Sequence, residues 1–143
     1  RSNGFKLNLD VHFEEVDLLQ DLSVLSFKDT FDIVVSNPPY IPHTDATSML
    51  PNVLNHEPHI ALFVPDSDPL LFYRRIVAFC EQYLRIDGYV FVEIHEELSA
   101  ATMQLFHESG FANIELRKDL QGKPRMIKAQ RVSLSCESGR SKS

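Results

Sequence analysis

The sequence predicts an α/β fold in which a mostly parallel sheet is covered by helices and ends in an antiparallel hairpin. Apolar runs of strand length alternate with segments of helical periodicity, a pattern typical of parallel strands joined by helices. The run FDIVVS at 31–36 is apolar almost throughout, as expected of a strand that is covered on both faces. The last two predicted strands have no helix between them, so they must run antiparallel if they are neighbours.

The first part of the chain predicts two strands and a long loop. Residues 1–10 read as the end of a helix that passes into a loop, and VHFEEV at 11–16 alternates like a short strand that ends at Asp17. FDIVVS is the second strand. Residues 38–69 hold most of the eight prolines of the chain and show little periodicity. They predict a long loop, and long loops in compact domains are usually functional.

The middle of the chain predicts a helix that begins at Asp68, a favoured N-cap, with Pro69 in the first helical position. Apolar residues follow at helical spacing as far as Leu84, and Asp87-Gly88 is expected to end the helix.

The strand YVFVEI at 89–94 comes next, followed by a helix from about residue 96 to 109 that stops at Gly110. FANIELR at 111–117 and RMIKAQR at 125–131 predict two final strands. We therefore expect one domain over residues 1–131 and a polar, disordered tail over 132–143.

Composition limits the class of protein. With 143 residues the chain has the length of one domain, and no apolar run approaches the ~20 residues that a membrane span needs. Two cysteines, Cys80 and Cys136, without paired spacing favour a reducing, cytoplasmic setting. The net charge of −6 argues against a nucleic-acid partner. We also expect no metal site, because His56 and His59 flank a proline in a loop instead of sharing a helix face.

The tetrapeptide NPPY at 37–40 carries the strongest chemical signal. It follows an apolar strand, and ligands bind beyond the carboxyl ends of such strands in open parallel sheets. Pro38 and Pro39 each fix their own φ and restrict the residue before them, which makes a stiff corner. The side-chain oxygen of Asn37 and the carbonyl of Pro38 are then two fixed acceptors beside the aromatic ring of Tyr40.

Two fixed acceptors beside a flat ring suit a planar NH2 group. The nitrogen of an amide or of an exocyclic amine is a poor nucleophile, and holding both of its hydrogens aims it and stabilises the positive charge that forms on it. The pattern therefore indicates methyl transfer from a sulfonium donor to such a nitrogen. A proline-rich strand end with an ordinary turn is the structural alternative.

Five blocks of the sequence resemble the HemK family, the protein-(glutamine-N5) methyltransferases that modify peptide chain release factors. The blocks are FDIVVSNPPYIP, NHEPHIALF, DPLLFYRRI, YVFVEIHEE and DLQGKPRMIKAQ, and they cover residues 31–130 in the order of the family. The resemblance implies a Rossmann-like S-adenosylmethionine-dependent methyltransferase fold, truncated here to the C-terminal part of the catalytic domain.

The implied reaction is N5-methylation of the glutamine in the Gly-Gly-Gln motif of bacterial-type release factors, with release factors as partners in translation termination. By match of motif, Asn37 and Pro38 are the implied catalytic residues. The implied substrate-binding residues are Asn37, Pro38, Pro39, Tyr40, Glu57 and Arg125. The resemblance also implies that Asp17, Leu18 and Asn37 contact S-adenosylmethionine.

The chain departs from the family at the cofactor loop. Its five glycines, at 4, 88, 110, 122 and 139, never cluster, whereas a cofactor loop of this kind is Gly-rich. The resemblance implies that the first two strands and this loop are not part of the sequence. We therefore expect the chain alone to be inactive, and we expect FDIVVS to become an open edge through which the chain self-associates.

Two other functions remain compatible with the residues. The first is an amino methyltransferase acting on adenine or guanine in DNA or RNA, which uses the same NPPY chemistry. The second is a non-catalytic remnant that serves as an interaction module.

Overall fold

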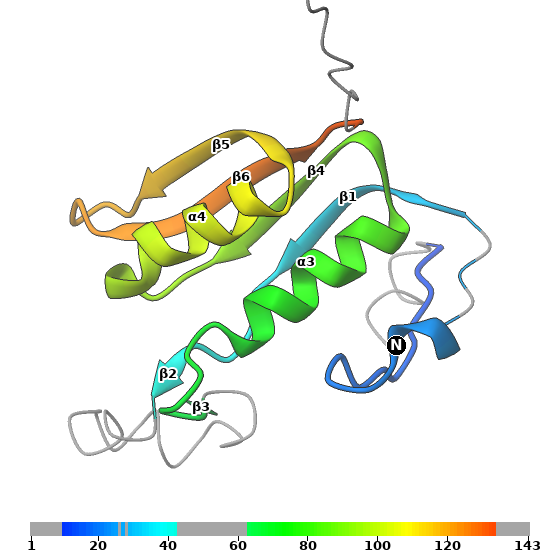
Figure 1. The fold of residues 1–143 in the computed structure, drawn as a ribbon, viewed down its shortest axis with the longest axis horizontal. Coiled ribbons are helices and arrows are strands. Elements are labelled where there is room, and N and C mark those ends of the chain that lie inside the picture. The colour runs from blue at the N-terminus through cyan, green and yellow to red at the C-terminus, as the bar shows by residue number, and fades with distance from the viewer. Residues whose placement is uncertain (1–9, 26, 28, 43–62, 134–143) are drawn as a thin grey trace, which may run out of the picture.

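The computed structural model describes residues 10–25, 27, 29–42 and 63–133 (Figure 1). In chain order its elements are η1 (Leu22–Val24), β1 (Phe31–Ser36), β2 (Ile41–Pro42), β3 (Phe63–Val64), α3 (Leu71–Tyr83), β4 (Leu84–Glu93), η4 (Glu96–Leu98), α4 (Ser99–Glu108), β5 (Phe111–Lys118) and β6 (Pro124–Arg131). The α/β class is confirmed. The predicted tail from 134 and most of the segment 1–10 lie outside the described residues.

The main sheet has the strand order β1-β4-β6-β5. β1 and β4 run parallel, whereas β4 with β6 and β5 with β6 run antiparallel. The predicted C-terminal hairpin is therefore confirmed. The described sheet is mixed and less parallel than we expected, because the hairpin supplies two of its four strands and β6 inserts between β4 and β5.

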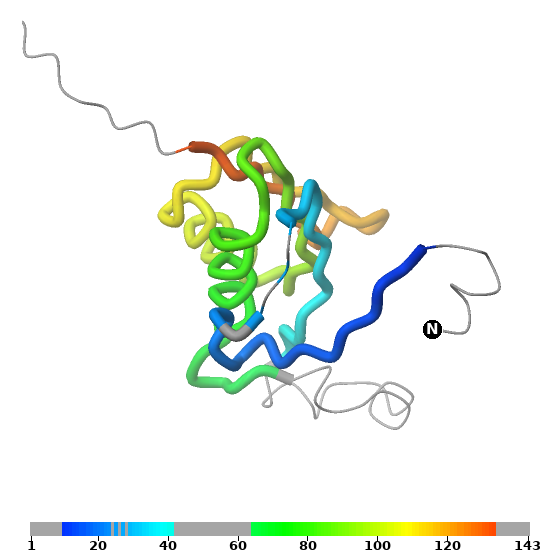
Figure 2. Tube along the Cα trace, turned by 90° about the vertical axis from the view of Figure 1, so that its right-hand side faces the viewer, coloured from blue at the N-terminus to red at the C-terminus, as the bar shows by residue number. Residues whose placement is uncertain are grey.

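The two α-helices cover one face of the sheet. α3 contacts β1 and β4, and α4 contacts β5 and β6. Figure 2 shows the helices together on one side of the strands. Between helices and sheet lies a buried apolar core to which Ile76 and Cys80 of α3, Val90 of β4, Phe106 of α4 and Ile127 of β6 contribute.

Within the described residues the opposite face of the sheet carries no helix, contrary to the expectation that both faces are covered. FDIVVS forms β1 with the predicted bounds. Its side chains alternate, however: Val34 packs against the core, while Ile33 and Val35 are 57% and 76% exposed. β1 is also the edge of the described sheet, as expected if no further strand pairs with it.

The segment 11–16 was predicted as a strand and has no strand structure. A strand is stable only when its backbone groups pair with a neighbour, and no described strand pairs with this segment. Its apolar residues Val11, Phe13 and Val16 are 48%, 45% and 40% exposed. An alternating pattern alone was therefore insufficient to make a strand.

The predicted bounds of the first helix need correction at both ends. α3 begins at Leu71, two residues after Pro69, and it ends at Tyr83 instead of at Asp87-Gly88. The chain passes directly into β4 at Leu84. The register jumps from Phe31 opposite Leu84 to Ile33 opposite Tyr89, so Asp87 and Gly88 lie in an irregular stretch of a strand.

The second helix and the hairpin agree well with the sequence. The His95 side chain caps η4 by accepting a hydrogen bond from the Glu97 N–H at 3.3 Å. Gly110 has a φ of 78° and ends α4, with its N–H donating to the His107 carbonyl at 3.0 Å. In the turn between β5 and β6, Gly122 has a φ of 83°.

Among the described helices, none combines the length and the apolar composition that a membrane span requires.

We expect Gly88→Ala to weaken the pairing of β1 with β4. A Cβ at this position would lie 2.8 Å from Leu84 Cδ1 and 2.9 Å from the carbonyl oxygens of Arg85 and Asp32. Backbone oxygens cannot move away cheaply, so the free energy of unfolding should fall by about 2 kcal/mol in urea titrations. Gly122→Ala is the control, because a Cβ there would meet nothing within 4 Å. The cost of this substitution is only the strain of a left-handed φ, about 1 kcal/mol. Equal losses in the two variants would contradict the close approach of the strands.

Candidate functional site

The predicted catalytic corner follows β1 directly. Asn37 is exposed and Pro38 is buried, while Pro39 and Tyr40 are half-buried. Because β1 and β4 are parallel and Ser36 pairs with Val92, the corner lies beside the carboxyl end of β4. This is the edge at which ligands of such sheets bind.

Two short strands, β2 and β3, come next in the described part of the chain. β2 and β3 pair in parallel, with Ile41 opposite Phe63 and Pro42 opposite Val64. Pro42 and Phe63, the described residues on either side of segment 43–62, therefore lie in neighbouring strands. Glu57, a predicted substrate-binding residue, lies outside the described residues, as do His56 and His59.

Tyr40 connects the corner to β4. Its hydroxyl donates a hydrogen bond to Glu93 Oε1 at 2.7 Å, and its ring packs against the core with the His95 ring 6.3 Å away. Tyr73 of α3 donates to the backbone carbonyl of Glu93 at 3.2 Å. Burial raises the pKa of the Tyr73 hydroxyl, so Tyr73 remains a donor. Two tyrosines from distant parts of the chain, Tyr40 and Tyr73, thus donate hydrogen bonds to Glu93.

A hollow of about 280 Å³ lies on the face of the sheet away from the helices. We call it the open-face hollow. Among the residues that line it are Val35, Asn37, Phe91, Glu93, Met126 and Lys128. Val90 and Val92 point into the core, so Phe91 between them points the other way. The lining is mainly apolar, and its polar residues include Asn37 and Glu93 together with the basic residues Arg117 and Lys128.

A second hollow, also about 280 Å³, lies on the helix side of β1. We call it the helix-side hollow. Leu18, Phe27, Val34, Ile76 and Phe79 are among the residues that line it. Val35 and Ser36 line both hollows, so the two cavities flank the carboxyl-terminal half of β1. Leu18 and Asn37, both predicted to contact the cofactor, therefore lie on opposite sides of one strand.

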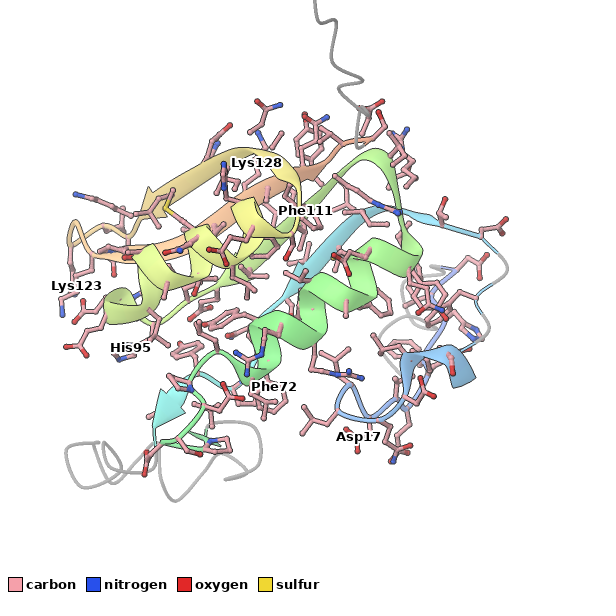
Figure 3. All side chains as sticks on the ribbon, in the orientation of Figure 1. Asp17, Phe72, His95, Phe111, Lys123 and Lys128 are labelled. Atoms are coloured by element: carbon pink, nitrogen blue, oxygen red, sulfur yellow. The ribbon has the colours of Figure 1, made fainter. Side chains whose placement is uncertain are left out.

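Asp17 lies in a turn that α3 holds in place. Its carboxylate accepts from the Leu19 N–H at 2.9 Å, and Arg75 Nε donates to the Leu18 carbonyl at 2.8 Å. Arg75 also hydrogen-bonds the Gln20 carbonyl. In Figure 3, Asp17 and His95 lie on either side of the first turns of α3. Asp17 is exposed and lines neither hollow.

Arg125 belongs to the hairpin turn. Its Nε lies 3.2 Å from Asp119 Oδ2, and Asp119 Oδ1 accepts from the N–H groups of Gln121 and Lys123 at 2.9 and 3.0 Å. The Lys123 N–H, with the Arg125 guanidinium acting in the same sense, lowers the pKa of the Asp119 carboxyl. Arg125 is not among the residues that line the open-face hollow. Its predicted role in substrate binding stays a prediction.

Glu93, Tyr73 and Arg75 were missed by the sequence analysis. Glu93 carried a usable signal, since an acidic residue at the end of an apolar strand lies at the same sheet edge as Asn37. Tyr73 and Arg75 had none, because their partners are backbone carbonyls of distant segments. No three His, Cys, Asp or Glu residues in the described part of the chain gather into a metal site.

No protein-family model matches the sequence. Among curated proteins, the release factor glutamine methyltransferase of Flavobacterium psychrophilum is 39% identical over 128 residues, which are 90% of this chain and 44% of that protein. The protein of the same name from Bacteroides thetaiotaomicron is 37% identical over 131 residues, 92% of this chain and 46% of that protein. Over the region that it matches, the chain is similar in sequence to release factor glutamine methyltransferases.

The chain spans about half the length of the release factor glutamine methyltransferases that it matches. Among solved structures, the protein-(glutamine-N5) methyltransferase (release factor-specific) of Alicyclobacillus acidocaldarius is 29% identical. The match covers 73% of this chain and 50% of that one, with a TM-score of 0.45.

We expect Arg75→Ala to release the turn that carries Asp17. Hydrogen bonds from a charged donor typically contribute about 2 kcal/mol, so unfolding free energy should fall by about that amount. Hydrogen exchange at the Leu19 and Gln20 amides should rise. Arg74→Ala is the matched control, because Arg74 pairs with the partly exposed Asp68 and such pairs contribute about 0.5 kcal/mol. Unchanged exchange in Arg75→Ala would contradict a clamp at this position.

Proposed function

We propose that this chain is the C-terminal part of a protein-(glutamine-N5) methyltransferase that methylates release factors. The observation that carries the proposal is the position of Asn37. It follows β1 at the carboxyl edge of the sheet and lines the open-face hollow, in a chain 39% identical to a release factor glutamine methyltransferase. The proposed setting is the cytoplasm, in keeping with Cys80, a free thiol buried in the core.

The proposed substrate is the glutamine of a Gly-Gly-Gln motif. Asn37 Oδ1 and the Pro38 carbonyl oxygen would each accept a hydrogen bond from one N–H of the glutamine side-chain NH2 group. Holding both hydrogens aims the nitrogen and stabilises the positive charge that builds on it as the new bond forms. Tyr40 would pack beside the amide plane. The nitrogen gains a carbon–nitrogen bond and then releases one of its hydrogens as a proton.

S-adenosylmethionine is the proposed cofactor, and the residues present fit it in part. The helix-side hollow has an apolar lining that suits an aromatic ring, with Leu18 and Val34 in its wall. Val35 and Ser36 line both hollows, so we propose that the methyl end of the cofactor reaches the Asn37 corner at the carboxyl end of β1. When bound, the cofactor supplies an electrophilic methyl carbon, and its sulfur keeps the electron pair of the broken bond. We propose that Asp17, in the turn next to Leu18, lies near the adenine of the cofactor.

The chain by itself is proposed to be inactive. Its five glycines never cluster, so the printed sequence contains no Gly-rich turn for a cofactor. We propose that the cofactor site is completed by the part of the relatives' sequences that this chain does not match.

A fusion tests the function. The part of the Flavobacterium relative that this chain does not match is joined ahead of Arg1, and the product is incubated with a release factor and methyl-labelled S-adenosylmethionine. Mass spectrometry should find one added methyl group on the Gly-Gly-Gln glutamine. Transfer to DNA or RNA instead would favour the nucleic-acid alternative, and transfer to neither would favour a non-catalytic remnant.

Asn37→Ala in that fusion should lower the rate of methyl transfer by about 100-fold, the usual effect of losing one aligned polar group in a reacting site. Gln104→Ala, on the exposed side of α4, should leave the rate unchanged. A fully active Asn37→Ala variant would disprove the assigned role.

We also propose that the chain alone self-associates through β1. This strand is the edge of the described sheet and presents Ile33 and Val35 to solvent. Exposed apolar edges readily pair with a second chain. The added half in the fusion is proposed to cover the same edge.

Light scattering should therefore show dimers or larger species for the chain alone and a monomer for the fusion. Val35→Lys should shift the chain toward monomer, whereas Ile86→Lys, at an exposed apolar residue outside β1, should not. A monomeric chain at the concentrations of the assay would overturn the edge contact.

A further inference from the structure

Glu93, at the carboxyl edge of the sheet, is held by contacts from several elements. β4 lies between β1 and β6, and Glu93 pairs with Met126 of β6. Its carbonyl accepts from the Tyr73 hydroxyl at 3.2 Å, and the next N–H, that of Ile94, donates to the Arg125 carbonyl at 2.9 Å. The backbone of Glu93 is thus held by a helix and by a neighbouring strand.

The Glu93 side chain transfers this rigidity to the NPPY corner. Its Oε1 accepts the hydrogen bond of the Tyr40 hydroxyl at 2.7 Å. Tyr40 is three residues from Asn37, and the two residues between them are prolines with fixed φ. The corner is therefore attached at two points, at Ser36 by the pairing of β1 with β4 and at Tyr40 by Glu93. Few free backbone torsions remain between these points.

Glu93 also shares the open-face hollow with Asn37. A carboxylate at this place could act in two ways. It could position the corner through Tyr40, or its charge could act directly on the positive nitrogen that forms during methyl transfer. The hydrogen bond from Tyr40 favours the first role, because it commits one carboxylate oxygen to the loop.

We propose that Glu93 is a positioning residue for Asn37 and Pro38 and acts through Tyr40. The inference rests on the proposed function and deepens it. Positioning needs an acceptor for the Tyr40 hydroxyl and no charge. Glu93→Gln keeps such an acceptor, whereas Glu93→Ala removes it, and Tyr40→Phe removes the donor with the loss of a single oxygen atom.

The first experiment does not depend on methyl-transfer activity. Hydrogen exchange is measured at the Asn37, Tyr40 and Ile41 amides in the chain as it stands. Glu93→Ala and Tyr40→Phe should each raise exchange by about 10- to 30-fold, the equivalent of one lost hydrogen bond to a charged group. The double variant should exchange no faster than either single one, because both remove the same contact. Glu97→Ala, a nearby exposed carboxylate, is the control and should match the unchanged chain.

The second experiment measures methyl transfer in the fusion. Glu93→Ala and Tyr40→Phe should each lower kcat by about 10- to 100-fold, as expected when reacting groups are misplaced. The KM for the release factor should stay within about twofold. Glu93→Gln should restore most of kcat, and the double variant should be no slower than the slower single one.

The outcomes separate the two hypotheses. If Glu93→Gln is as slow as Glu93→Ala, the charge matters and positioning is wrong. Multiplicative effects of Glu93→Ala and Tyr40→Phe on kcat or on exchange would also overturn the inference, since the two residues would then act independently. If the parent fusion transfers no methyl group, the proposed function fails, while the exchange data still decide whether Glu93 holds the corner.

Discussion

The parallel pairing of β1 with β4 is the constraint on which the candidate site depends. Parallel strands end at the same edge of a sheet, so residues 53 positions apart in the chain, Tyr40 and Glu93, come within hydrogen-bonding distance. An antiparallel pairing would have placed Asn37 beside the start of β4 instead. The irregular stretch at Gly88 serves this pairing, because only a residue without a side chain allows β4 to approach the Asp32 carbonyl so closely.

Helix α3 fixes what lies around the paired strands. Its apolar side packs Ile76, Val77 and Cys80 against the sheet. Its polar side chains bind backbone carbonyls of two other segments. The Tyr73 hydroxyl donates to the Glu93 carbonyl, and Arg75 Nε donates to the Leu18 carbonyl. At its last turn the Tyr83 hydroxyl contacts the Leu22 carbonyl at 3.1 Å. One helix thus holds both Glu93, at the far end of β4, and the segment that carries Asp17.

In the described structure, helices cover one face of the sheet and leave the other face exposed. Helices bury one face of the sheet, while Val35, Ile33 and Met126 remain exposed on the other. β1 presents an edge of unpaired backbone groups within the described residues. Curated relatives are about twice as long as the matched region. An apolar face and an open edge are the surfaces that a further part of a domain would bury, so the proposed activity and the open surfaces have a common explanation.

Local sequence determined the elements whose signals are short-range. The bounds of β1, the stop of α4 at Gly110, the hairpin turn at Gly122 and the stiff NPPY corner follow from apolar runs, proline geometry and glycine at positive φ. Tertiary structure decided the rest. VHFEEV lacks a described neighbour and forms no strand, and α3 ends at Tyr83 because Leu84 is needed in the sheet. Glu93 and Arg75 gained their importance from partners more than 50 residues away, and such contacts leave no periodic pattern in a sequence because only the packed fold brings the two atoms together.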